Sequence, residues 1–215
     1  MVYHTYIFFS VKASFNKQSK STKENFKKAF LQDLKNEKKC VIYTYATLGL
    51  KGNSTFLVWF QADSIETIQD CLNNLMHSKV GTYLKITHTL FGMVRGSQYS
   101  STKQLDTRRK GGAYLIIYPF TKTYEWYKLS FEQRKDLMEG HISIGRNYPQ
   151  ITQLLLYSYG VDDQDFIVSY ETDDLADFQS LVIDLRSDKV RAYTLSDTPI
   201  FTCIYKTPEE LIKFL

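Results

Sequence analysis

The sequence predicts an α+β protein built from two tandem ferredoxin-like lobes. The main observation is an internal repeat, since residues 41–75 resemble residues 151–185 at a spacing near 110. Each copy contains an aromatic-rich strand, a glycine, a polar turn, a second strand and an amphipathic helix. A strand and a helix precede each copy, and a further strand follows it. This order is β-α-β-β-α-β twice, and two such sheets in one chain can pack into an α+β barrel-like body with its helices outside.

The first lobe is expected over residues 1–95. Apolar residues at helical spacing predict a helix over Lys23–Asn36. Asp63 and Glu66 fit a capping box, which predicts the start of a second amphipathic helix. The first and last strands of this lobe are expected at Tyr6–Val11 and Thr82–Val94.

A linker is expected over 96–112, because this stretch is polar, basic and glycine-containing and has no apolar period. The second lobe then covers 113–215. Its helix is predicted over Ser130–Gly140, with Ser130 and Gln133 as a capping box. Its first and last strands are expected at Ala113–Pro119 and Pro199–Tyr205, and a short helix capped by Thr207 ends the chain.

Composition excludes several classes of protein. With 215 residues, 43% hydrophobic, the chain can bury a core and is not disordered. No apolar run is long enough for a membrane span or a signal peptide, and three scattered cysteines fit buried thiols in a reducing compartment, so a cytoplasmic protein without a membrane partner is expected. The net charge is +4, and the Lys-rich stretch 17–39 is typical of a solvated helix. No nucleic-acid-binding signature occurs, so no nucleic-acid partner is expected.

His141 is the strongest candidate for a residue with a chemical role. It follows the predicted helix, one turn after Leu137 and Met138, and Ile144 continues the same apolar surface. A neutral imidazole on such a surface is either a hydrogen-bonded core histidine or a ligand to a metal or haem. The residues alone favour the core histidine. No multi-histidine zinc motif is present, but haem needs a single axial histidine.

The stretch from Tyr118 to Asp163 resembles the chlorite dismutase superfamily, above all its coprohaem decarboxylase branch. YPFTK is similar to that branch's Tyr-Pro-Met-Ser-Lys motif, and WYKLSFEQRKDLMEGH is similar to its Trp-Tyr-x-Leu-Pro…Arg…Met…His helix. HISIGRNY followed by GVDDQDF resembles the pattern His…Gly-Arg-x-Tyr…Gly-Leu-Asp-Asp. These motifs cover most of the second lobe in one order. In the first lobe only the repeated topology supports the resemblance.

The resemblance implies a dimeric α+β barrel subunit, assembled as a homopentamer, with haem and its iron in the second lobe. It makes His141 the proximal iron ligand and places Gln153 at the distal position, with one residue fewer before Gln153 than the family usually has. Leu154 is the other distal candidate. Chlorite dismutases carry arginine there, and an amide holds an anionic oxidant less well than a cation does. The reaction with chlorite itself is therefore not expected.

The resemblance also implies roles for four further residues. Tyr118 matches the catalytic tyrosine of the decarboxylase, Lys122 and Arg146 match cations that bind the porphyrin propionates, and Trp126 matches an aromatic residue near the proximal side. Taken alone, these residues would be a strand-end tyrosine, two surface charges and a core tryptophan. An acid that orients the proximal histidine has no clear counterpart, and Asp197 is the candidate.

Three interpretations remain open from the sequence. The first is peroxide-dependent decarboxylation of coprohaem to haem b, the last step of a haem biosynthesis route, with the porphyrin and hydrogen peroxide as partners. The second is a chlorite dismutase-like haem protein with another peroxidase activity. The third is a haem-binding protein without turnover, or a relative that has lost haem.

Overall fold

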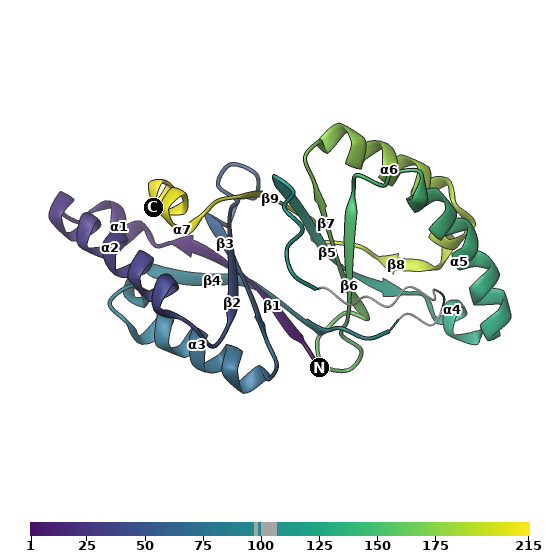
Figure 1. Cartoon of the computed structure of the whole chain (residues 1–215), viewed down its shortest axis with the longest axis horizontal. Helices are drawn as coiled ribbons and strands as arrows, with labels where there is room; N and C mark the ends of the chain where they lie inside the picture. Colours follow the sequence, from purple (N-terminus) through teal and green to yellow (C-terminus); the bar gives the residue numbers. More distant parts are fainter. Residues whose placement is uncertain (97–98, 100–106) are drawn as a thin grey trace. The chain divides into compact units, whose positions relative to one another are not determined.

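The computed structural model describes residues 1–96, 99 and 107–215, and the chain divides into two compact units. Unit 1 comprises residues 1–93 and 201–215, and unit 2 comprises residues 94–200. In each unit the helices cover one face of an antiparallel sheet (Figure 1). Both units are ferredoxin-like, which confirms the predicted fold class of two such lobes. The barrel stays a prediction.

The sheet of unit 1 is built around its two central strands, β1 (Tyr3–Val11) and β3 (Phe56–Ala62). β4 (Leu84–Met93) pairs with β1, and β2 (Val41–Ala46) pairs with β3, all antiparallel. The resulting order β4-β1-β3-β2 is that of a ferredoxin-like sheet. The central strands read as nearly continuous apolar runs because both of their faces are buried.

Two long helices cover one face of this sheet. α2 (Lys20–Asn36) and α3 (Ile65–His77) each direct three side chains into the core. Ser64, not Asp63, caps α3, because its hydroxyl accepts a hydrogen bond from the backbone N–H of Thr67 at 3.2 Å. The predicted capping box of Asp63 and Glu66 was therefore wrong. The short helices of this unit are α1 (Ala13–Asn16), η1 (Gly81–Tyr83), α7 (Pro208–Leu211) and η3 (Ile212–Phe214).

The C-terminal stretch differs from the expected division of the chain. β9 (Phe201–Tyr205) was expected to close the second lobe, but Tyr45 and Ala46 of β2 pair with it in unit 1. α7 begins with the predicted cap at Thr207, and its Leu211 is fully buried in the core of unit 1. Burial of this apolar side chain favours the packing of residues 201–215 with unit 1.

Unit 2 carries a sheet in which β7 (Phe166–Thr172) lies between β5 (Tyr114–Lys122) and β6 (Thr152–Tyr157). The short β8 (Thr194–Ser196), which the sequence did not indicate, pairs with the end of β5. α6 (Leu175–Ser187) and η2 (Lys189–Tyr193) follow β7. Part of the predicted linker 96–112 lies outside the described residues, and its described part 107–112 contains no helix or strand.

Two helices follow β5, namely α4 (Tyr124–Lys128) and α5 (Phe131–Arg146). Both hydrogen bonds of the predicted capping box are present at Ser130 and Gln133. However, α5 does not end at Gly140 as expected, and His141 therefore lies inside the helix. A glycine within a helix costs only about 1 kcal/mol relative to alanine, and the helix continues past Gly140 to Ile144, which packs against the apolar cluster of unit 2.

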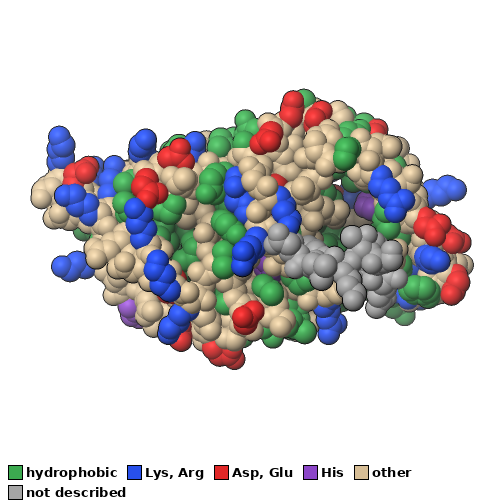
Figure 2. Space-filling view, viewed as in Figure 1, with side chains coloured by type: hydrophobic (Ala, Val, Ile, Leu, Met, Phe, Trp, Pro, Cys, Tyr) green, Lys and Arg blue, Asp and Glu red, His purple; other side chains and the backbone are tan. Residues whose placement is uncertain are grey.

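Lysine side chains gather over the α1–α2 end of unit 1 (Figure 2). Phe26, Phe30 and Leu34 turn the opposite stripe of α2 into the core, so the basic side chains form a solvated face, as the sequence predicts. Within the described part of the chain, no helix is both long enough and apolar enough to cross a bilayer.

Candidate functional site

The predicted site residues of β5 and β6 share one face of the sheet in unit 2. In the register of the sheet, Gln153 and Ile116 both lie opposite Tyr170, and Tyr118 lies opposite Val168. Side chains alternate along a strand, so Tyr118 and Lys122 point to the same side as Gln153. This is the side on which the helices pack, because Ile144 of α5 and Leu181 of α6 belong to the same apolar cluster as Tyr118.

The interface between α5 and this sheet face is only partly closed. None of the residues of α5, all of which the structure describes, is fully buried. Of the residues of α6, which is also described throughout, only Leu181 is buried. The apolar side chains that line this interface are half-buried, namely Tyr118, Phe120, Ile144, Tyr148, Ile151, Leu155, Phe178 and Leu185. Such a surface suits a flat apolar group inserted between helix and sheet.

His141 lies on the sheet-facing side of α5, one turn before Ile144. Its Nδ1 atom is buried and lies 3.7 Å from Oδ2 of Asp188, and neither atom has a hydrogen-bond partner among the described residues. Burial lowers the pKa of His141 below its ordinary value, the charge of Lys122 lowers it further, and the Asp188 carboxylate opposes both effects. The imidazole is therefore neutral at pH 7, with Nε2 as the nitrogen that remains to bind a metal.

Lys122 is held over the ring of Trp126, with Nζ 4.4 Å from the ring centroid. Trp126 is 3% exposed and itself packs against Tyr193. Burial lowers the pKa of Lys122 to about 8, and the charge of Arg191 contributes to this shift. The ammonium group is still mostly protonated at pH 7, and it is poorly solvated. It can thus bind a carboxylate more strongly than a surface lysine can.

Tyr118 is paired with a second tyrosine. Its ring stacks on that of Tyr170, with the ring centroids 6.2 Å apart. Burial raises the pKa of Tyr118, and the interaction with the Tyr170 hydroxyl lowers it in part. Tyr118 therefore keeps its proton at neutral pH.

Asp197 does not lie beside the histidine as suggested from the sequence. Its Oδ2 atom accepts a hydrogen bond from Nη1 of Arg191 at 2.8 Å and lies 3.7 Å from Nη2 of Arg186. These three charged groups influence the pKa of Tyr118. Arg186 of α6 and Arg191 of η2 thus place positive charge near Tyr118, which the sequence had not indicated.

The structure does not bring Arg146 to the same place. It is exposed in the last turn of α5, five residues after His141 and therefore about 140° around the helix from it. Gln153 is also exposed at the start of β6, although its strand position directs it to the helix side of the sheet. Both assignments stay predictions.

Sequence reasoning missed three residues near the site, namely Asp188, Tyr170 and Arg191. Tyr170 could have been found, because it stands two residues from Val168 on an alternating strand and shares its face. Asp188 and Arg191 had no local signal. Their position depends on how the turn between α6 and β8 packs beneath α5.

The sequence profile of the chlorite dismutase family matches residues 19–206. A protein described as coproheme decarboxylase from Mycolicibacterium smegmatis is 25% identical over 171 residues, which are 78% of this chain and 74% of that protein. Chlorite dismutase from Ideonella dechloratans is 28% identical over 162 residues, which are 70% of this chain and 57% of that protein.

Solved structures of chlorite dismutase from Candidatus Nitrospira defluvii share the fold. One, of a variant with arginine replaced by alanine, has a TM-score of 0.92 at 23% identity and covers 99% of this chain and 94% of its own. Another, in complex with imidazole, has a TM-score of 0.88 at 23% identity with the same coverage. The family profile matches most of the chain, and the fold agrees with it. The chain belongs to the chlorite dismutase family.

Proposed function

We propose that this protein binds haem in unit 2 and uses peroxide to decarboxylate the propionate groups of coprohaem, which yields haem b. The observation that carries the proposal is that one sheet face presents Tyr118 and Lys122 toward the helix that bears His141. The family relationship and the coproheme decarboxylase of Mycolicibacterium smegmatis support it.

The residues present fit a haem group. The half-buried apolar side chains between α5 and the sheet offer two apolar walls for a porphyrin. His141 supplies a neutral nitrogen donor whose second nitrogen already faces a carboxylate, Asp188, as metal-binding histidines commonly do. A small shift of either side chain would form the missing hydrogen bond between them. Asp188 is thus the residue that we propose as the orienting acid.

Haem iron that has reacted with peroxide supplies the oxidising equivalents when the group is bound. Tyr118 would then give up an electron and its phenolic proton, and the resulting phenoxyl radical would take a hydrogen atom from a propionate side chain, which restores the tyrosine. Loss of carbon dioxide and transfer of a second electron to the oxidising equivalent that remains from peroxide would leave a vinyl group, so that each propionate consumes one peroxide. The ring of Tyr170, which stacks on that of Tyr118, holds the phenol in one orientation.

Lys122 binds the carboxylate that is to be lost. Its ammonium group is buried over Trp126, and such a group pairs strongly with an anion. Because its pKa is lowered to about 8, the protonated form declines as the pH rises through that value. Arg191 adds positive charge near Tyr118, although its side chain is already paired with Asp197. Chlorite is a poorer substrate candidate, because Gln153 has no charge to hold that anion.

The test is to mix the purified protein with ferric coproporphyrin, add dilute peroxide and measure the porphyrin mass. The wild type should lose two carboxyl groups. Tyr118→Phe should bind the porphyrin with an unchanged Soret band and form no product. Tyr124→Phe is the matched control, because Tyr124 is 70% exposed on α4 and should decarboxylate like the wild type.

An unchanged porphyrin mass in the wild type, together with a shifted Soret band, would refute decarboxylation and favour another haem-dependent oxidation. Product formation by Tyr118→Phe at the wild-type rate would remove Tyr118 from the mechanism. The absence of any spectral change on mixing would refute haem binding.

A further inference from the structure

A pair of thiols lies in unit 1, outside the site in unit 2. Cys40 stands directly before β2, and Cys71 lies in the middle of α3. Their Sγ atoms are 2.7 Å apart although the residues are 31 positions apart in sequence. The third cysteine, Cys203, is also a free and buried thiol. The chain therefore carries one thiol pair and, as an internal comparison, one further buried thiol.

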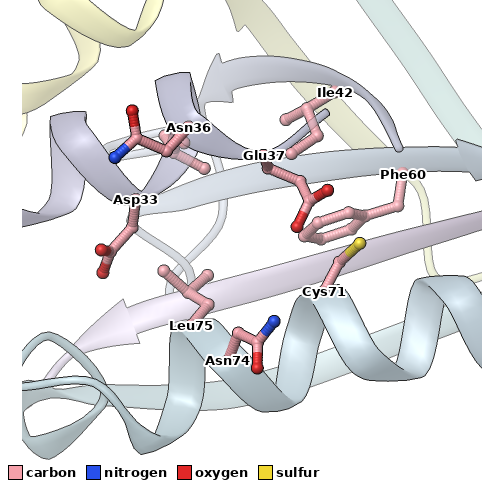
Figure 3. A pocket seen from close by; sticks show the side chains of 9 residues that line it. Asp33, Asn36, Glu37, Ile42, Phe60, Cys71, Asn74 and Leu75 are labelled. Atoms are coloured by element: carbon pink, nitrogen blue, oxygen red, sulfur yellow. The ribbon is translucent and has the colours of Figure 1, made fainter. Parts of the chain in front are cut away.

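The two thiols differ in their access to small molecules. Cys71 lines a cavity of about 240 Å³ between α2 and α3, together with Glu37, Asn74 and Leu75 (Figure 3). Cys40 does not line this cavity, and its Sγ atom is directed to Cys71 and to the carbonyl oxygen of Thr67. A small oxidant in the cavity would thus reach the Cys71 sulfur, which is in contact with that of Cys40.

We propose that Cys40 and Cys71 form a reversible intramolecular disulfide when the protein meets hydrogen peroxide. The Cys71 sulfur attacks one peroxide oxygen, the O–O bond breaks, and a sulfenic acid and one water form. The Cys40 sulfur then attacks Cys71, the S–S bond forms, the S–O bond breaks, and a second water leaves with the Cys40 proton. The two sulfurs together lose two electrons, and peroxide is reduced to water.

The geometry requires little movement for this step. A disulfide has its sulfurs about 2.0 Å apart, so the pair must close by less than about 1 Å. Burial raises the pKa of both thiols, and the neighbouring Glu37 acts in the same direction on Cys71. The first oxidation is consequently slow for a thiol, because the thiolate is the nucleophile. The second step needs little movement, because its partner is already in contact.

The disulfide would join the entry of β2 to α3, and thus link the sheet of unit 1 to a helix that covers it. A covalent link across a loop of this length restricts the unfolded chain. We expect oxidation to raise the unfolding temperature of unit 1 by on the order of 5–10 °C. The fluorescence of Trp59 reports the unfolding of unit 1, since the only other tryptophan, Trp126, lies in unit 2.

The experiment treats the reduced whole chain with a small excess of peroxide, alkylates the remaining thiols after denaturation and maps the peptides. We expect one of three thiols to stay alkylatable, the peptides of Cys40 and Cys71 to be linked, and a dithiol reductant to restore all three. Cys203→Ser is the matched control and should form the same link. In Cys40→Ser the sulfenic acid at Cys71 should persist and react with dimedone.

Several results would overturn the proposal. They are three alkylatable thiols after treatment of the wild type, a linked peptide that contains Cys203, a covalent dimer on a non-reducing gel, or over-oxidised Cys71 without a link. Peptide mapping of the oxidised wild type tests the disulfide between Cys40 and Cys71 even if a serine variant fails to fold.

Discussion

The two units have the same ferredoxin-like topology but differ in how completely their helices cover the sheet. In unit 1, α2 and α3 each bury three side chains, and phenylalanines such as Phe30 and Phe56 pack edge to face in the core. In unit 2, α5 buries none of its residues and α6 buries only Leu181, with both helices described throughout. One unit is thus closed by its own side chains, and the other leaves an apolar interface partly open.

This difference in packing implies that the two units differ in how much hydrophobic stabilisation their helices contribute. A helix that packs fully on its sheet contributes hydrophobic stabilisation, about 25 cal/mol for each Å² of apolar surface removed from water. A helix whose apolar side chains stay half-buried forgoes part of that contribution. In unit 2 this surface lies beside a neutral His141 and the buried ammonium of Lys122, which is the arrangement expected of a binding site.

The largest effect should come from the core of unit 1. Phe30 is fully buried, so Phe30→Ala should destabilise the protein by about 3–5 kcal/mol. The same substitution at Phe178, which is half-buried on α6, should cost about 1–2 kcal/mol in the absence of haem. Urea unfolding of the wild type and of both variants gives the change in the free energy of unfolding. Equal costs would mean that the two cores are equally well packed.

The next effect concerns His141. His141→Ala should weaken haem binding by more than about 100-fold, because loss of the axial ligand exceeds the effect of losing an outer-shell partner. A haem titration followed at the Soret band measures the affinity. His77→Ala, on α3 of unit 1, is the control and should bind like the wild type. A full-strength Soret band in His141→Ala would exclude the residue as the ligand.

The smallest of these effects concerns His4 in unit 1, which is fully buried, whereas His141 in unit 2 is half-buried. His4 is fully buried, its Nδ1 accepts a hydrogen bond from Nε1 of Trp59, and burial lowers its pKa to about 3. The unfolded chain takes up a proton at His4 below pH 6.5, whereas the folded chain does not. Stability is therefore complete above pH 6.5 and should fall by about 2 kcal/mol between pH 6.5 and 5.

Urea unfolding of Trp126→Phe at several pH values checks this, because Trp59 fluorescence then reports unit 1 alone. In His4→Asn, whose side-chain oxygen can replace Nδ1 as the acceptor, the pH dependence should shrink. A stability that does not change between pH 7 and 5 in the wild type would show that His4 titrates normally.

Much of the fold could be predicted because it rests on local signals. The repeat of 41–75 in 151–185, the capping box at Ser130 and Gln133 and the apolar stripe of α2 all act over a few residues. The strand alternation that puts Tyr118 and Lys122 on one face is equally local. Two of the predictions that failed, the end of α5 at Gly140 and the capping box at Asp63, were matters of element boundaries.

By itself, the sequence determined the α+β class, the two ferredoxin-like units and the presence of His141, Tyr118 and Lys122 in one lobe, because periodicity and motif spacing are properties of neighbouring residues. Only the tertiary structure decided that Asp188 faces His141, that Tyr170 pairs with Tyr118, that β9 joins unit 1 and that Cys40 meets Cys71. These contacts join residues far apart in the chain, and strand register and helix packing select them through burial of the whole core.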